Sequence, residues 1–410
     1  MASSTIWDPL IPLASRMPRV VREHEILRLS ATIRTRMPKE EMDGAVQHVL
    51  AWSQKRAGAR LPPEAWAKES FEFYSGGRNS IGVRLSEDKT DIWAIRTDDP
   101  DKTVPGRTWT NEVVIGRIEG QLPRFSVRQT VSTAEHDLQI DPHSPGFVQQ
   151  IVESCGLWNG PYKLDSNPRL IDSDEEADLL VDMMVDSDRS LPLLVVTTET
   201  DATPYSHAID PSGFGRALLG LGHVIVLPAR FTWVLTERFG RQRSVFGGAI
   251  RYYQAGFNDE SGPYEHKLFI ANQLTTLEDR LKVVRWIRAT AASDSIRRSR
   301  LGIDVLPFSS IRNAAARLRQ IQLESFGASE SEQLQAAKKR IKLLESELSE
   351  ERSSQDYYIG EHDLSELRAK AAEEQARASA FRIQQLMQQA RPCGRIDSGI
   401  GFGVPLRVML

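Results

Sequence analysis

Polar residues follow an apolar run in the stretch LPLLVVTTETD, residues 191–201. The apolar part is typical of a strand that is buried on both faces of a parallel sheet. Ligands of open parallel sheets bind beyond the carboxyl ends of the strands. We therefore predict a site at the end of this strand, with Thr198 as a ligand-binding residue and with Glu199, Asp201 and His207 as the candidate catalytic residues.

The segment that leads from this strand to the next helix is compatible with a site but does not define its chemistry. The connection TTETDATPYSHAIDP is longer than the roughly 2–6 residues that usually join a strand to a helix. The helix begins at Asp210 and carries Gly213 and Gly215, whose bare amides are able to meet a phosphate or a carboxylate. Neither a dinucleotide-binding fingerprint nor a P-loop lysine accompanies them, so the cofactor is unknown. A polar loop with Asp210 as a plain N-cap explains the same residues.

Two further candidate ligand-binding residues follow the next predicted strands. Arg230 comes after the strand HVIVLP, and Tyr253 ends the strand GGAIRYY, so both could line the same crevice. An arginine in such a place suits an anionic ligand. Each residue is equally compatible with a surface position. His223, which begins a strand, is expected to be a packed histidine rather than a base.

Other groups of reactive residues have simpler explanations. Residues 172–188 contain eight carboxylates and no lysine or arginine, but they lack the glycine and the spacing of a calcium loop and are favourable near a helix N-terminus. The acids of the loop 98–101 and Glu112 suggest a nuclease, yet Glu112 is followed by VVIGR, without the lysine that such a site needs. Cys155 is expected to be a buried thiol. The sequence therefore predicts no metal site.

The first module of the chain is expected to be α+β. A helical pattern runs over Arg19–Ser53, and Pro38 with the acids behind it marks a helix start. Alternating apolar and polar residues then predict four strands, at 80–85, 91–96, 108–120 and 124–132. The alternation indicates an antiparallel sheet with one face toward water, and the misfit Gln129 is expected near an edge.

The second module is expected to be an α/β core. Its first helix begins with the capping-box pair Ser173 and Glu176. Apolar strands and amphipathic helices then alternate as far as the strand GGAIRYY, which predicts a parallel sheet with right-handed crossovers. EHKLFI is a candidate edge strand of this sheet, and residues 277–290 are expected to form a helix.

The rest of the chain is expected to form a C-terminal coiled-coil arm. With Leu334 at an a position, one heptad frame continues to Ala390, although its middle is polar. Two short coiled coils joined by a hinge and an antiparallel hairpin both fit this pattern. We predict a disordered segment 1–16, an α+β module 17–160, a Rossmann-like α/β core 161–300, a helical or coiled-coil arm 301–390 and an irregular tail 391–410.

Composition limits the classes of function. The 410 residues carry a net charge of −3, so no overall field draws the chain to DNA or to an anionic membrane. The two cysteines, Cys155 and Cys393, suit a reducing cytosol. No stretch approaches the roughly 20 apolar residues of a membrane-spanning helix, and the first residues lack the apolar core of a signal peptide. We therefore expect a cytoplasmic protein without a membrane partner.

One segment departs from this balance of charge. Residues 278–342 contain fourteen lysines and arginines against seven acids. Its basic part, 280–342, is able to contact nucleic-acid phosphates. Because few aromatic residues accompany the arginines, we favour a solvated helix that pairs with the acidic segment 172–188 of a neighbouring molecule.

A resemblance adds a context for the protein. The segment GGAIRYYQAGFNDESGPYEHKL and the α/β pattern before it resemble parts of uncharacterised bacterial multidomain proteins, some of them from mobile or defence-related genomic islands. The resemblance covers residues 80–275 and implies no catalytic residue.

The sequence as a whole favours a bacterial cytoplasmic interaction or regulatory protein, for which the resemblance implies a defence-related role. We expect it to form homo-oligomers through residues 334–390 and to bind a protein partner. Two alternatives stand beside this function. The first is an enzyme, a hydrolase or a nucleotide-binding one, with its site at the carboxyl ends of the parallel strands. The second is a nucleic-acid-associated protein that uses residues 280–342.

Overall fold

The computed structural model describes residues 21–135, 138–200, 209–325, 334–335, 337–346, 348–349 and 352. The chain divides into two compact units, 1–341 and 342–410, and both sheets described here lie in the first unit. The predicted segments 1–16 and 391–410 and most of the heptad segment 334–390 of the predicted arm 301–390 lie outside the described residues. None of the helices in the described part is both long and apolar enough to cross a membrane.

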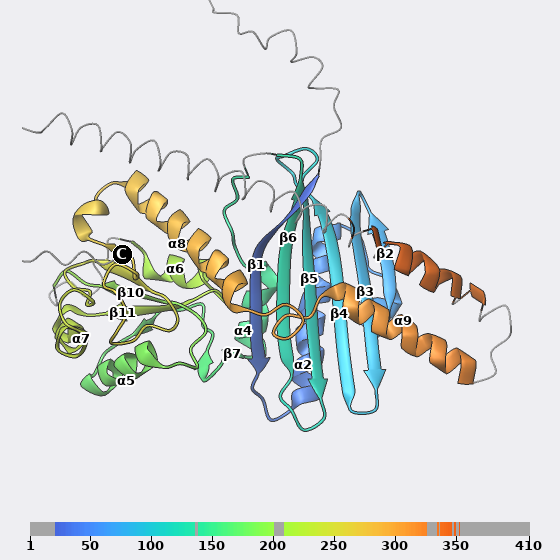
Figure 1. Ribbon diagram of the computed structural model, residues 1–410, viewed down its shortest axis with the longest axis horizontal. Coiled ribbons are helices and arrows are strands. Elements are labelled where there is room, and N and C mark those ends of the chain that lie inside the picture. The colour runs from blue at the N-terminus through green and yellow to red at the C-terminus, as the bar shows by residue number, and fades with distance from the viewer. Residues whose placement is uncertain are drawn as a thin grey trace, which may run out of the picture. The chain divides into compact units, whose positions relative to one another are not determined.

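Sheet A contains eight strands, all paired antiparallel, in the order β2-β3-β4-β5-β6-β1-β7-β8 (Figure 1). The predicted antiparallel sheet is therefore present. Its strands are β1 Arg22–Ile33, β2 Phe71–Ser75, β3 Arg78–Glu87, β4 Thr90–Pro100, β5 Thr108–Ile118, β6 Arg124–Thr133, β7 Leu157–Asn159 and β8 Tyr162–Lys163.

The first part of the predicted helix Arg19–Ser53 is a strand, so that prediction is wrong for β1. In β1, Leu27, Leu29, Ala31 and Ile33 are buried at every second position, and the strand pairs with β6 along its length. This long pairing overrides the weak helical pattern of the segment. The helix begins at Pro38, as its proline and acids predict, and α2 extends over Pro38–Ala57.

One face of sheet A carries the larger apolar core of the module. Helices α2, α3 (Pro63–Trp66) and α4 (Gly146–Ser154) cover this face, and Met42, Val46 and Val49 of α2 pack among the strand residues. Gln129 also points into this side, from a central strand rather than from an edge. Its amide nitrogen donates to Oδ1 of buried Asn111 at 2.9 Å, which replaces the solvent contact that an edge would provide.

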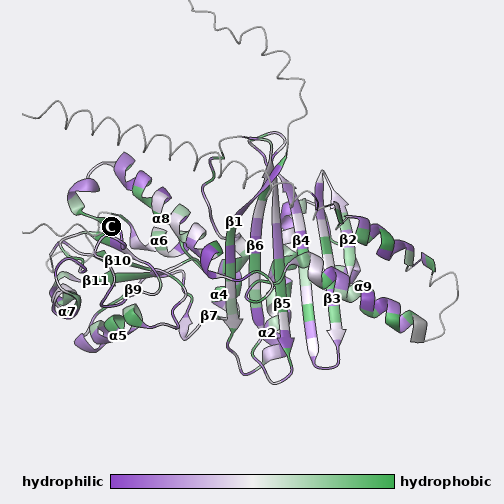
Figure 2. Ribbon diagram, viewed as in Figure 1, coloured by the Kyte–Doolittle hydropathy of each residue, from purple (hydrophilic) through white to green (hydrophobic). Residues whose placement is uncertain are grey.

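Part of the second face of sheet A is covered by a helix, which corrects the expectation of a face toward water for strands β3 to β5. Helix α9 (Phe308–Ser325) crosses strands β3 to β5 in Figure 1. Phe308 and Ile311 of α9 pack against Val83, Ala94 and Val114 of these strands. The alternation of the strands is visible in Figure 2, but small apolar residues on the second face give α9 a place to pack.

Sheet B contains five strands in the order β13-β12-β10-β11-β9. They are β9 Arg169–Leu170, β10 Leu193–Thr197, β11 His223–Leu227, β12 Ile250–Tyr253 and β13 Leu268–Phe269. Strands β9, β11 and β10 are parallel, whereas β12 and β13 are antiparallel. The expectation of a parallel third strand is therefore wrong. The backbone N–H of Gly248 donates to the carbonyl of Thr198, so the chain enters β12 beside the end of β10. The direction in which a strand runs through the sheet cannot be predicted from an apolar run alone.

Helices cover both faces of sheet B. Alternate residues of β10 belong to two separate cores: Leu193 and Val195 to one, Leu194 and Val196 to the other. Helices α5 (Asp174–Val185) and α7 (Thr232–Phe239) pack on the first core, while α6 (Pro211–Ala217) and α8 (Leu277–Arg298) pack on the second. Strand β10 is thus buried on both faces, as its apolar run predicts.

Helix α8 also contacts sheet A and so connects the two sheets (Figure 1). Strand β7 pairs with β1 only at Thr32 and Ile33, and α8 covers the edge of β1 beyond them. The backbone N–H of Arg28 donates to Oγ of Ser295 on α8 at 3.0 Å. Helix α8 therefore covers the edge of β1 and provides a hydrogen-bond acceptor for it, at a place where another strand could otherwise pair.

His223 at the start of β11 is buried, and burial together with the charge of Arg189 lowers its pKa to about 4. The unfolded chain has the ordinary pKa of about 6.5, so it binds a proton in a pH range where the folded chain does not. The stabilising contribution of neutral His223 is therefore complete above about pH 6.5 and is lost as the pH falls toward 4. Between pH 7 and pH 5 we expect His223 to lower the free energy of unfolding by about 2 kcal/mol.

Urea denaturation of His223→Leu at both pH values tests this. The burial of His266 also lowers the pKa of that side chain to about 4, so the variant should lose about half of the acid sensitivity. An unchanged pH profile would show that His223 accepts its proton in the folded state.

Candidate functional site

The polar side chains at the end of β10 are engaged in hydrogen bonds with neighbouring loops. Thr197 and Thr198 are fully buried. Oγ1 of Thr197 donates to the carbonyl of Ala249 at 2.9 Å, and Oγ1 of Thr198 accepts from the backbone N–H of Ala229 at 2.9 Å. Both hydroxyls therefore attach the strand end to neighbouring loops. Thr198, predicted to bind a ligand, has a structural role here.

Only one of the three candidate catalytic residues lies in the described part of the chain. Glu199 is exposed beside Gly248, where an added Cβ would lie 2.7 Å from Cγ of Glu199. Asp201 and His207 lie outside the described residues. Among the residues that are described, no group of three or more His, Cys, Asp or Glu side chains is arranged to hold a metal ion.

The two glycines of α6 serve packing and capping. The carboxylate of Asp210 accepts from the N–H groups of Ser212 and Gly213, at 3.0 and 2.9 Å, so Asp210 is the N-cap that the sequence allows. Gly215 lies against the backbone of the preceding loop, because an added Cβ would lie 2.2 Å from the carbonyl oxygen of Ser166. The Gly213 amide that was predicted to meet a ligand already has an acceptor within the chain.

Arg230 and Tyr253 do not meet in one crevice. The guanidinium of Arg230 lies 4.8 Å from the ring centre of Phe231, near the end of β11. Tyr253 is buried and pairs with Leu193, at the opposite end of β10 from Thr198. Its hydroxyl donates to a backbone carbonyl. The prediction that Tyr253 lines the crevice is wrong, because β12 is antiparallel.

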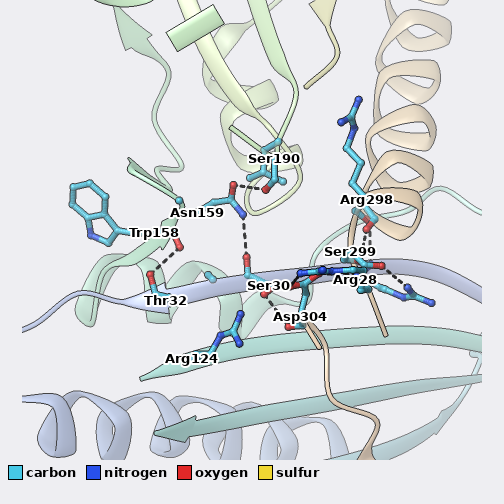
Figure 3. A pocket seen from close by; sticks show the side chains of 15 residues that line it. Arg28, Ser30, Thr32, Arg124, Trp158, Asn159, Ser190, Arg298, Ser299 and Asp304 are labelled. Carbon is cyan, nitrogen blue, oxygen red and sulfur yellow. Dashed lines mark hydrogen bonds and ion pairs between the residues drawn. The ribbon is translucent and has the colours of Figure 1, made fainter. Parts of the chain in front are cut away.

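A different cavity combines cations and polar groups. It has a volume of about 400 Å³ and lies between the edge of β1, the end of β7 and the C-terminus of α8 (Figure 3). Such a volume is within the range of small-molecule sites, about 300–1,000 Å³. Four arginines line it, and we call it the arginine cavity: Arg28, Arg124, Arg298 and Arg300.

Arg28 forms part of the wall of the arginine cavity. Its guanidinium pairs with both carboxylate oxygens of Glu25, at 2.7 and 2.6 Å. It also donates to the carbonyl of Ser299 at 2.8 Å, just beyond the last residue of α8. A cation at that end of a helix is favourable because the carbonyls carry partial negative charge. Arg28 thus fixes the helix end from which Arg298 and Arg300 extend.

Arg124 is the cation with the most free donors. It begins β6 and pairs in register with Thr32 of β1. Figure 3 shows its side chain beside Thr32 and Ser30, on the side of Asp304. Within the described part of the chain it makes no hydrogen bond or ion pair, although its charge acts on Asp304 through space. Arg298 donates from one nitrogen to the carbonyl of Ala255, and its other side-chain N–H groups make no hydrogen bond with the described residues.

Asp304 supplies the one carboxylate of the cavity lining. Its Oδ2 accepts from the backbone N–H of Arg300 at 2.8 Å and from Nε of Arg300 at 3.2 Å. Burial alone would raise the pKa of Asp304, but the hydrogen bonds from Arg300 and the charge of Arg124 lower it below its ordinary value. The carboxylate is therefore ionised at neutral pH. The four arginines still leave the lining with an excess of positive charge.

The hydroxyl groups of the lining already donate within the protein. Oγ of Ser30 donates to the carbonyl of Asp304 at 2.9 Å, and Oγ of Ser190 donates to Oδ1 of Asn159 at 2.7 Å. Nδ2 of Asn159 donates to the carbonyl of Ser30 at 3.2 Å, which joins β7 to β1. These bonds fix the wall before any ligand arrives. The donors that remain are those of the arginines, so the lining favours a ligand rich in acceptors.

Sequence patterns did not identify this cavity. Its arginines come from β1, from β6, from the end of α8 and from the linker after α8, and these parts are far apart in the chain or in different elements. The one signal in the sequence is the basic segment 280–342, which contains Arg298 and Arg300 and predicts a solvated helix or, as the alternative, a nucleic-acid surface. No family model matches the chain, and no curated protein or solved structure is significantly similar to it.

Proposed function

We propose that the protein is a binding protein with a regulatory role and that it recognises an anionic, phosphate-bearing ligand in the arginine cavity. The observation that carries this proposal is that four arginines line a cavity of about 400 Å³ and that one of them, Arg124, has no hydrogen-bond partner among the described residues. The lining offers donors and fixed walls. It brings together no nucleophile and base, so binding is favoured over catalysis.

The chemistry of the lining favours phosphate over other anions. A guanidinium presents a planar fork of donors that matches two oxygens of a phosphate. Arg124 offers such a fork beside Thr32 and Ser30, whereas the side chain of Arg298, also in the lining, points away from Arg124 in Figure 3. The ring of Trp158 forms part of the wall, but the guanidinium of Arg34 already lies 4.6 Å from its centre.

A thermal-shift series on the full chain tests the proposal. A ligand that binds only the folded state stabilises it by about 2.7 kcal/mol at about 100 times its Kd. We therefore expect pyrophosphate and nucleoside triphosphates to raise the melting temperature by several degrees, and uncharged nucleosides to leave it unchanged. A single-stranded oligonucleotide that shifts the transition when pyrophosphate does not would overturn the proposal in favour of a nucleic-acid surface.

The remaining parts of the function are proposals from the sequence. The heptad frame over 334–390 supports a homo-oligomer, and the resemblance supports a bacterial protein with a defence-related role. An enzyme site at the end of β10 is less favoured, because Thr197, Thr198 and the Gly213 amide are engaged in hydrogen bonds within the protein.

A further inference from the structure

The outer face of α8 carries apolar side chains that nothing in the described part of the chain covers. Leu277 is 72% exposed and Leu281 47%, and the two lie one turn apart on the helix. Exposed Ile270 precedes the helix. Two cations continue the same face: Lys282, which forms an exposed ion pair with Glu278, and Arg285, which makes no hydrogen bond or ion pair with the described residues.

The outer face of α5 is complementary to that of α8. Leu179 is 54% exposed in the middle of the helix. Glu175, Asp178 and Asp182 are exposed around it and recur at helical spacing. The first turn of a helix favours acids, but Asp178 and Asp182 lie beyond that turn, where the helix dipole gives them no benefit. This face therefore presents an apolar centre among negative charges, whereas α8 presents an apolar strip beside positive ones.

The two faces cannot meet within one molecule. Helix α5 packs on the core that contains Leu193 and Val195, and α8 packs on the core that contains Leu194 and Val196, so they cover opposite faces of sheet B. We propose that α8 of one molecule docks on α5 of a second copy. The partner is a second copy because this chain itself carries the complementary charge and the matching exposed leucine.

This contact has a defined symmetry. Because α5 and α8 cover opposite faces of sheet B, one partner cannot meet both, so the contact is heterologous and a pair of molecules keeps one free α5 face and one free α8 face. Copies therefore add head to tail, into a ring or an extended stack. The contact is independent of the arginine cavity and of the predicted arm. Since paired charges flank it, we expect it to weaken in high salt.

Charge reversal tests the contact in the full chain. We expect Lys282→Glu with Arg285→Glu, and separately Asp178→Lys with Asp182→Lys, to weaken association at least about tenfold, as measured by sedimentation velocity. The chain that carries all four changes should associate again, because both signs are exchanged. Lys55→Glu, on an exposed position of α2, is the matched control and should have no effect.

Disulfide trapping tests the orientation, in full chains with Cys155→Ala and Cys393→Ser. Asp178→Cys in one chain and Arg285→Cys in another should give a cross-linked dimer when mixed. Each chain alone should give none. Cross-linking of either chain with itself would show a twofold contact instead and overturn the proposal. So would the absence of any cross-link together with unchanged association of both charge-reversed chains, provided that circular dichroism shows them folded.

Discussion

Replacing Arg189 by methionine should lower the free energy of unfolding by about 3–5 kcal/mol. The side chain is only 1% exposed, and burial lowers its pKa to about 10, so it is still charged at neutral pH. Its guanidinium donates to Met183 O and Met184 O at the end of α5, to Leu191 O before β10 and to Gln254 O after β12. Methionine would fill the space but would leave these buried carbonyls without donors.

Urea denaturation at neutral pH measures the effect of Arg189→Met. Arg189→Lys keeps the charge but not the planar fork, and we expect it to recover only part of the loss. The control is Arg238→Ala, because Arg238 forms an exposed ion pair with Asp259 and should cost at most about 1 kcal/mol. Equal effects of Arg189→Met and Arg238→Ala would show that the buried network does not hold these elements together.

Replacing Arg124 by glutamate should abolish most ligand binding in the arginine cavity. A hydrogen bond to a charged group contributes about 1.5–3 kcal/mol, so Arg124→Ala should weaken pyrophosphate binding about 10- to 100-fold. Arg124→Glu adds repulsion, and we expect a loss of at least about 100-fold. Neither change should reduce stability much, because Arg124 is exposed and makes no hydrogen bond within the described part of the chain.

Replacing Asp304 should have the opposite effect on the affinity for pyrophosphate. Its carboxylate repels an anion in the cavity, so Asp304→Asn should strengthen pyrophosphate binding in isothermal titration. Arg60→Glu is the matched control for Arg124→Glu, because Arg60 is exposed just after α2, on the other face of sheet A. If Arg60→Glu lowered the affinity for pyrophosphate as much as Arg124→Glu, or if Asp304→Asn bound pyrophosphate more weakly, the assignment of the cavity would be contradicted.

Local patterns predicted many of the elements of the fold. The apolar run of β10 predicted a buried strand, and Ser173 and Asp210 are the caps that their positions suggest. These features depend on neighbours within a few residues. Strand β1 was not predicted, because its pairing with β6 joins residues about a hundred positions apart. The direction of β12 was missed for a related reason, since burial pattern does not report where the chain re-enters a sheet.

The candidate site was harder to predict than the fold. Rules for parallel sheets predict the site at Thr198 and Glu199. In the mixed sheet, however, Tyr253 lies at the opposite end of β10, and Thr198 accepts a hydrogen bond from the loop after β11. The arginines of the cavity lie on three elements and the linker after α8, and a lone arginine in a strand has no sequence signal of its own. The buried position of Arg189 likewise has no signal in the neighbouring sequence. Only the packing of α8 on the edge of β1 brings Arg28, Arg124 and Arg298 together.

A crystal structure of the full chain grown with pyrophosphate tests the central claim most directly. We predict difference density for the anion inside the arginine cavity, within hydrogen-bond distance of the guanidinium of Arg124, and no such density in crystals of Arg124→Glu. An empty cavity at a saturating concentration, or an anion bound only at the end of β10, would contradict the proposed function.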